Sequence, residues 1–200
     1  MITHYKTIAA PAEAEYKDRG SRFIAFAFPA PSVDVVKARL KALRDEHPKA
    51  AHHCTAYRMG PDGQTFRASD DGEPAGSAGK PILAAIDSRQ LTDTCVIVVR
   101  YFGGTLLGVP GLIAAYRTVA SLALQLTAVV EKPVLKSLAI TFDYTALGDV
   151  MQSIKKYGAT ITQNDSGLFS SVHLSVPLAV YEALVQALAA VPGVETKAPA

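Results

Sequence analysis

The sequence has few cysteines, little net charge and no long apolar run, and each shortage excludes a class of protein. The 200 residues include only two cysteines, Cys54 and Cys95, too few for a disulfide-stapled secreted domain. No apolar run approaches the roughly 20 residues that a membrane-spanning helix needs, and the N-terminus lacks the basic and apolar blocks of a secretory signal. We therefore expect a cytoplasmic protein without a membrane segment.

Charge and hydropathy set a second bound on function. The 20 basic and 18 acidic residues leave a net charge of +2, too small to indicate nucleic-acid binding by itself. About half of the chain (49%) is hydrophobic and only 19% is charged, which excludes a disordered protein. The length fits one or two compact domains.

The residue pattern changes at Glu131-Lys132-Pro133, so we expect one domain over residues 1–132 and a second over residues 136–200. In the second, alternating strands and amphipathic helices follow the order β-α-β-β-α-β, which is typical of a ferredoxin-like sandwich. The fold class is therefore α+β. The 16 basic and 13 acidic residues before residue 135 give the first part a charge of +3, and the 4 basic and 5 acidic residues after it give −1.

The first domain is expected to contain a sheet covered by helices. Its most apolar segment, Thr94 to Tyr101, is predicted to be the central strand, because buried strands are almost continuously hydrophobic. Ser32 is predicted to cap a helix that runs to about Glu46. Further strands are predicted at residues 5–9, 22–28, 52–59 and 64–68 in the first domain, and at 159–163 and 168–176 around a turn at 164–167 in the second.

A glycine-rich segment, Gly103 to Gly111, joins the central strand to a long helix. This arrangement can cradle an anion, because free backbone N–H groups and the helix dipole point the same way. Val109 and Pro110 stand where a phosphate-binding loop needs Lys and Ser or Thr, and the dinucleotide fingerprint fails as well. Ligand contact and a purely structural tight connection both remain open.

The acidic segment Asp70-Asp71-Gly72-Glu73 could hold a hard cation, but it lacks the alternating ligand spacing of a calcium loop. A solvated turn that caps the next helix is the alternative. His52-His53-Cys54 is too sparse for zinc, and on a strand His53 faces away from Cys54. We therefore expect no metal site and no cofactor.

These segments together resemble a known family. The blocks that carry the resemblance are His53-x-Thr55-Ala56-Tyr57, then Asp70-Asp71-Gly72-Glu73-Pro74-x-Gly76-Ser77-Ala78-Gly79-x-Pro81, then Arg100-Tyr101-Phe102-Gly103-Gly104 with Leu107-Gly108, Gly111-Leu112 and Ala115-Tyr116. In order and spacing they are similar to the YigZ/IMPACT family, in its two-domain bacterial form. The resemblance implies a first domain like domain IV of elongation factor G and a ferredoxin-like second domain like its domain V. It also implies a role in the regulation of translation.

The chain departs from the family pattern in its glycine segment. Leu106, Pro110 and Ala114 stand where family members often have Lys, Gly and Arg. Two positive charges that could meet phosphates are therefore missing, so any binding to RNA should be weak and non-specific.

We therefore predict that the protein is a non-enzymatic cytoplasmic regulator of translation that binds RNA, the ribosome or a translation-related protein. The residues expected to contact a ligand or partner are His53, Arg58, Asp70, Asp71, Glu73, Gly76, Gly79, Arg100, Tyr101, Phe102, Gly103, Gly104, Gly108, Gly111 and Tyr116.

The alternative is a small hydrolase or phosphate-ligand enzyme with its site between the Asp70–Lys80 and Gly103–Gly111 loops. Geometry separates the two interpretations. Convergence of the three carboxylates with His53 in a pocket favours the enzyme, and an open basic surface favours binding.

Overall fold

A computed structural model describes residues 1–166 and 170–197 and divides the chain into two units, each with its own hydrophobic core. One unit is Tyr5–Lys132, and the other combines Met1–His4 with the chain from Pro133 onward. The boundary thus differs from the one expected from sequence at the N-terminus. There the Val134 N–H donates to the Thr3 carbonyl oxygen at 2.8 Å, which ties the first residues to the second unit.

The first unit is built on a five-stranded antiparallel sheet in the order β2-β3-β6-β4-β5. The central strand is β6, Thr94–Tyr101, as its apolar sequence predicts. The other strands are β2 (Ala12–Asp18), β3 (Ser21–Pro29), β4 (His52–Met59) and β5 (Thr65–Ser69). A separate two-stranded sheet pairs β1 (His4–Ile8) with β7 (Val129–Pro133).

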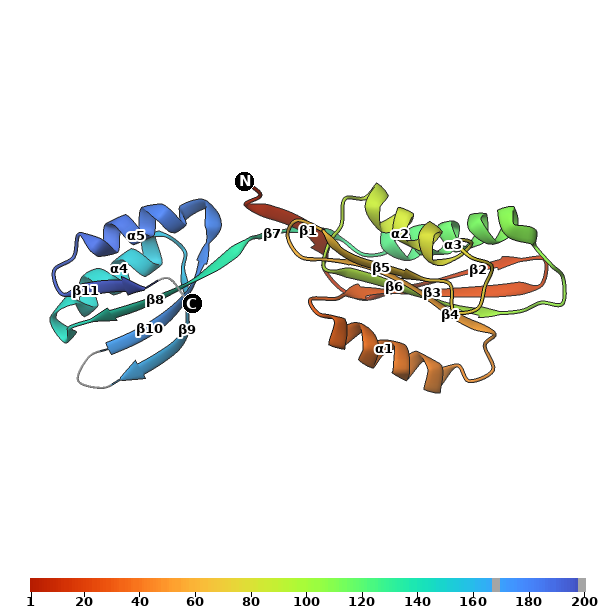
Figure 1. Ribbon diagram of the computed structural model, residues 1–200, viewed down its shortest axis with the longest axis horizontal. Helices are drawn as coiled ribbons and strands as arrows, with labels where there is room; N and C mark the ends of the chain where they lie inside the picture. The colour runs from red at the N-terminus through yellow and green to blue at the C-terminus, as the bar shows by residue number, and fades with distance from the viewer. Residues whose placement is uncertain (167–169, 198–200) are drawn as a thin grey trace. The chain divides into compact units, whose positions relative to one another are not determined.

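Helices cover both faces of the five-stranded sheet (Figure 1). On one face lie α2 (Gly79–Ser88) and α3 (Gly108–Gln125), and on the other lies α1 (Val33–Glu46). Alternation along β4 divides its side chains between two cores: Cys54 packs under α2 and α3, and Tyr57 packs under α1. Ser32 caps α1 by accepting from the Val35 N–H, which confirms the predicted start of that helix.

The second unit has the ferredoxin-like element order expected from the sequence. Its strands form a sheet in the order β11-β8-β10-β9, with β10 antiparallel to both of its neighbours. The elements are β8 (Leu135–Phe142), α4 (Leu147–Lys156), β9 (Thr160–Ser166), β10 (Ser170–Pro177), α5 (Tyr181–Ala189) and β11 (Val194–Lys197), with single 3₁₀ turns at Tyr144–Ala146 and Leu178–Val180. The α+β class is therefore confirmed, and the likeness of the two units to domains of elongation factor G stays a prediction.

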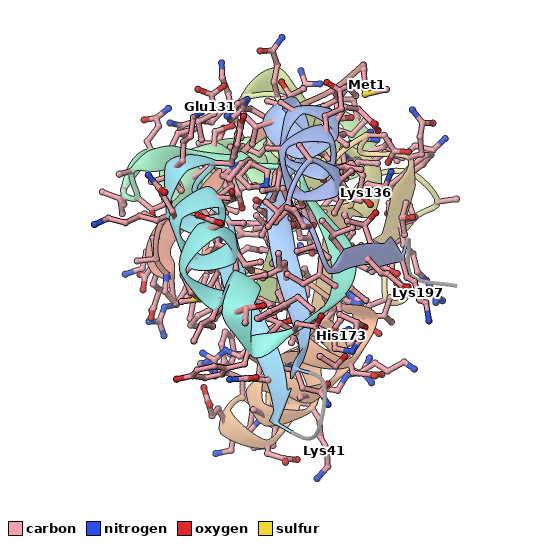
Figure 2. All side chains as sticks on the ribbon, turned by 90° about the vertical axis from the view of Figure 1, so that its left-hand side faces the viewer. Met1, Lys41, Glu131, Lys136, His173 and Lys197 are labelled. Carbon is pink, nitrogen blue, oxygen red and sulfur yellow. The ribbon has the colours of Figure 1, made fainter. Side chains whose placement is uncertain are left out.

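Figure 2 looks onto the second unit, where α4 and α5 lie next to each other. The ammonium of Lys136 on β8 lies 3.9 Å from the centre of the Tyr181 ring, which helps to hold α5 on the sheet. The turn predicted at residues 164–167 is wrong in its first three positions, because β9 continues through Ser166. Its last position, and the start of the strand predicted from 168, lie outside the described residues.

Candidate functional site

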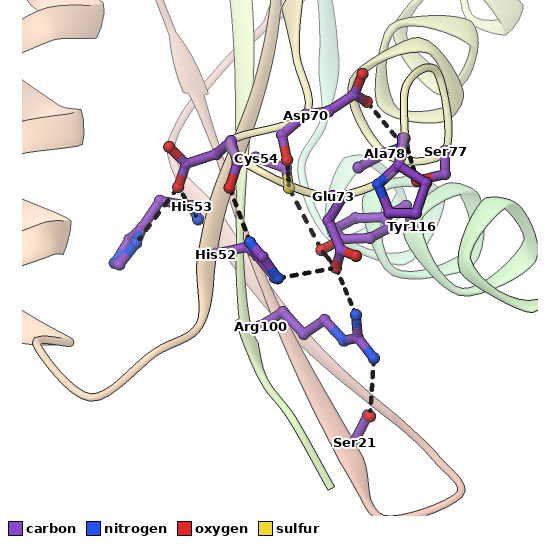
Figure 3. A network of polar contacts seen from close by, with 12 residues as sticks. Ser21, His52, His53, Cys54, Asp70, Glu73, Ser77, Ala78, Arg100 and Tyr116 are labelled. Atoms are coloured by element: carbon purple, nitrogen blue, oxygen red, sulfur yellow. Dashed lines mark hydrogen bonds and ion pairs between the residues drawn. The ribbon is translucent and has the colours of Figure 1, made fainter. Parts of the chain in front are cut away.

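A buried carboxylate, Glu73, is the centre of a polar network on the face of the sheet that α3 covers (Figure 3). Its Oε1 accepts from Arg100 Nη1 at 2.6 Å and from the Tyr116 hydroxyl at 2.7 Å. All three residues are buried, and His52 Nε2 lies 3.9 Å from the same oxygen. The Glu73–Arg100 ion pair satisfies two charges that would each be costly to bury alone.

The network extends on both sides of Glu73. Arg100 Nη2 donates to Ser21 Oγ at 3.3 Å, and Ser21 Oγ accepts from the Gly103 N–H at 3.2 Å. On the other side, Cys54 Sγ lies 3.3 Å from the Tyr116 hydroxyl. Burial raises the pKa of the Cys54 thiol and the pKa of the Tyr116 phenol, so both groups are protonated at neutral pH. A protonated, buried thiol is a poor nucleophile.

The Asp70 carboxylate accepts hydrogen bonds from backbone N–H groups that follow it in the chain. Its Oδ1 accepts from the N–H groups of Ala78 and Gly79 at 3.0 and 2.8 Å, and its Oδ2 accepts from Gly76 at 2.7 Å. Burial alone would raise the pKa of Asp70, but these three donors outweigh it and lower the pKa below 3.8. The carboxylate thus caps α2, which fits the sequence interpretation of a capping turn.

Asp71 turns away from Glu73. It has a left-handed backbone with φ of 44°, and its carboxylate accepts from Arg44 at 2.9 Å and from the His53 N–H at 2.6 Å. Its carbonyl oxygen lies 2.8 Å from His52 Nδ1. The His53 ring lies on the opposite side of β4 from His52, as strand alternation predicts (Figure 3).

The three carboxylates therefore do not converge with His53 in one pocket. Within the described residues, no group of three or more His, Cys, Asp or Glu side chains could hold a metal ion. Cys95 packs in the core under α1 and Cys54 in the core under α2 and α3, so the two thiols lie on opposite faces of the sheet.

The glycine segment lies beside the acidic loop, in a conformation that its glycines make possible. A Cβ on Gly103 would lie 1.9 Å from the Gly20 carbonyl carbon, so this position is glycine because two backbones meet there. Gly104 and Gly108 have φ of 84° and 70°. α3 then begins at Gly108, with Pro110 in its first turn as predicted.

Glu73 and Pro74 line a groove of about 450 Å³ together with the glycine segment. Its wall is apolar: Phe102, Leu106 and Val109 are 51%, 81% and 46% exposed. Arg100 is buried at its base, with its guanidinium carbon 5.6 Å from the centre of the Phe102 ring. The groove is therefore neither a pocket in which the three carboxylates meet His53 nor an open basic surface. From the sequence, the first is expected for an enzyme and the second for a binding protein.

The remaining expected residues are divided among separate places. Arg58 forms a two-point ion pair with Asp87, and the Tyr101 hydroxyl is 2.8 Å from His47 Nδ1 on the α1 side. Gly111 packs against Leu107, where a Cβ would come within 3.0 Å. In contrast, Glu73, Arg100, Phe102, Gly103 and Tyr116 are brought together at or under the groove.

Sequence reasoning missed two kinds of groove residue. His52 lines the groove, and the signal was present: on a strand it shares a face with Cys54. Leu106 and Val109 were noted only as departures from basic or phosphate-loop positions, although two exposed apolar residues in a glycine-rich loop also indicate a contact surface.

The fold and the site define a two-unit α+β protein with a charged network buried beneath an apolar groove. The profile of the Impact N-terminal domain family matches residues 19–124. YvyE of Bacillus subtilis, an IMPACT family member, is 35% identical over 156 residues, which are 78% of this chain and 72% of that protein. YigZ of Escherichia coli, also an IMPACT family member, is 35% identical over 86% of this chain and 85% of its own.

A solved crystal structure of a hypothetical protein matches 100% of this chain and 99% of its own length, with 31% identity and a TM-score of 0.80. The chain belongs to the IMPACT family, and the resemblance seen in the sequence is confirmed. No helix among the described residues is both long enough and apolar enough to span a bilayer.

Proposed function

We propose that this protein is a non-enzymatic regulator of translation that acts in the cytoplasm by binding a translation-related protein, free or on the ribosome, through the groove beside Glu73. Membership of the IMPACT family supports the role in translation. The resemblance implies this role most strongly for the eukaryotic members of the family. The observation that carries the binding role is the groove itself, whose buried charges Glu73 and Arg100 are paired with each other and whose wall is apolar and exposed.

The chemistry of the wall favours a protein partner over RNA. Phe102, Leu106 and Val109 present apolar area, which is characteristic of the contact core of protein interfaces. A surface that binds phosphates needs exposed cations, and the cation at the base of the groove, Arg100, is buried and paired with Glu73. A translation protein with an exposed apolar side chain fits this surface better than a phosphate backbone does.

The enzyme alternative needs a reactive group facing the groove. Glu73 has its Oε1 engaged by two donors, and Cys54 is buried and protonated. No specific observation favours a hydrolase or a phosphate-ligand enzyme, so we propose the binding function alone.

Replacing Leu106 with lysine tests the proposal and distinguishes the two kinds of partner. The wild type, Leu106→Lys and a control, Leu126→Lys, would each be used to capture translation components from a bacterial lysate, with and without nuclease. Leu126 is a suitable control because it is 68% exposed at the other end of α3. We expect capture to survive nuclease, to fall about tenfold or more in Leu106→Lys, and to be unchanged in the control.

An RNA partner would give the reverse pattern. Lysine at position 106 restores a cation of the family pattern, so RNA capture would strengthen in Leu106→Lys and disappear after nuclease treatment. That result would overturn the choice of a protein partner. Equal capture by all three proteins would overturn the assignment of binding to the groove.

A further inference from the structure

The His53-x-Thr55-x-Tyr57 motif has no part in the groove, because strand alternation turns these side chains to the α1 face of the sheet. There they line a second pocket, of about 240 Å³, between α1 and the β4–β5 hairpin. Val36 and Leu40 of α1 give it an apolar wall. The pocket and the groove are therefore separate sites on opposite faces of one sheet.

Three cations border this second pocket. Lys37 and Arg44 project from α1, seven residues and so two helical turns apart, and Arg67 projects from β5. The Arg67 guanidinium makes no ion pair or hydrogen bond with any residue that the structure describes. An arginine at the rim of a concave site with its donors unused can bind an anion from solution.

The nearby carboxylates only partly balance this charge. Asp71 pairs with Arg44 at 2.9 Å, and Asp34, which is 93% exposed, reaches Lys37 at 3.8 Å. An exposed pair of this length contributes little, so Lys37 is free to turn to a ligand. Three cations against two carboxylates leave a net charge of +1 at the pocket, and Arg67 is the cation without a carboxylate partner among the described residues.

One of the residues that line the pocket has an unsatisfied polar group. His53 is 8% exposed, and its Nε2 is buried without a hydrogen-bond partner among the described residues. Such a buried atom is uncommon in native proteins and often marks a place where a ligand or water completes the site. Burial lowers the pKa of His53, so the ring is neutral at neutral pH and adds no further charge.

We propose that this pocket binds a small phosphate monoester, with the phosphate held by Arg67 and Lys37 at the rim and the organic group lying against the apolar wall toward His53. Two cations that line one pocket suit a dianionic phosphate. The apolar wall and Tyr57 suit a flat or aliphatic organic group. The site lies outside the groove, so this proposal does not depend on the function proposed there.

Phenyl phosphate is a suitable probe because it combines one phosphate with one apolar ring. Titration into the full isotope-labelled chain, followed by amide NMR shifts, would report both affinity and location. We expect saturable shifts confined to α1, β4 and β5, and binding that weakens as salt is added.

Two matched arginine variants complete the test. Arg67→Gln should weaken binding about fivefold or more, because it removes one direct cation contact. Arg117→Gln, at an exposed arginine of α3 for which the described residues also offer no partner, should bind like the wild type. Thermal melting of both variants checks that each remains folded, which we expect because both side chains are exposed.

Three results would overturn the proposal. One is the absence of saturable shifts at millimolar phenyl phosphate. Another is an equal loss of affinity in Arg67→Gln and Arg117→Gln, which would show that the phosphate meets a general positive charge. The third is a set of shifts centred on the groove face, which would place the binding site there and not in this pocket.

Discussion

At the residue scale, Asp70 shows how one carboxylate can organise a loop. It accepts hydrogen bonds from the backbone N–H groups of Gly76, Ala78 and Gly79, and so its carboxylate caps the first residues of α2. The neighbouring carboxylates have other tasks: Asp71 joins the loop to α1 and β4, and Glu73 neutralises Arg100. Three carboxylates that stand within four positions in sequence therefore stabilise three different parts of the first unit.

Asp70→Asn tests this capping role through its pH dependence. We expect it to lower the free energy of unfolding by about 1–2 kcal/mol at neutral pH, because an amide offers one acceptor oxygen where the carboxylate offers two. The folded-state pKa of Asp70 lies below its ordinary value of 3.8, so its contribution is complete above that pH. As the pH falls through the folded-state pKa, the contribution is lost and the two proteins should converge.

Urea denaturation at neutral pH and again below pH 3.8 measures both effects. Asp45→Asn is the matched control, since Asp45 is exposed on α1 and the described residues offer it no ion pair. A difference for Asp70→Asn that stays constant across the pH range would contradict the capping account.

The sequence predicts which of these side chains share a site only for residues on one strand, because there alternation determines the face on which each side chain lies. Alternation along β4 correctly separates His53 from Cys54. It says nothing about Glu73, whose partners Arg100 and Tyr116 are 27 and 43 residues away in sequence. Burial of one carboxylate among three depends on tertiary packing, for which a local pattern carries no signal.

At the element scale, the strands with strong apolar patterns were predicted, and two weakly patterned strands, β2 and β7, were not. β4 and β6 have the bounds expected from sequence. β2 was missed because it contains alternating charged residues (AEAEYKD) and lies at an edge of the sheet, where one side of the strand faces water. β7 was missed because it is mostly exposed and is defined by pairing with β1, a partner far away in sequence.

The glycine segment gives a prediction at this scale, because its neighbouring glycines are needed for different reasons. Gly103→Ala should cost about 3 kcal/mol of stability, since its Cβ would overlap the backbone at Gly20. Gly104→Ala should cost only about 1 kcal/mol, because its φ of 84° is strained for alanine but no atom lies within 4 Å of the added carbon.

Chemical denaturation of the two variants compares these costs directly. Equal destabilisation would mean that backbone conformation, and not the close approach of the Gly103 and Gly20 backbones, decides both positions. A milder effect at Gly103 than at Gly104 would contradict the packing seen at the end of β6.

At the scale of the whole molecule, the chain combines a sheet with two separate candidate sites and a ferredoxin-like unit. The self-contained pattern of the second unit made its element order predictable. The grouping of Met1–His4 with that unit was not predictable, because it depends on a hydrogen bond between Thr3 and Val134, which only the folded chain brings together.

The central claim is that the groove beside Glu73 contacts a translation-related protein. Photocrosslinking tests it most directly, with benzoylphenylalanine placed at Phe102 in one protein and at Phe66 in another. Both residues are phenylalanines of the first unit with similar exposure, 51% and 56%, but Phe66 lies on β5 and does not line the groove. We predict a nuclease-resistant crosslink to a ribosomal protein or translation factor from position 102 alone, whereas the same crosslink from both positions, or from position 66 alone, would contradict the claim.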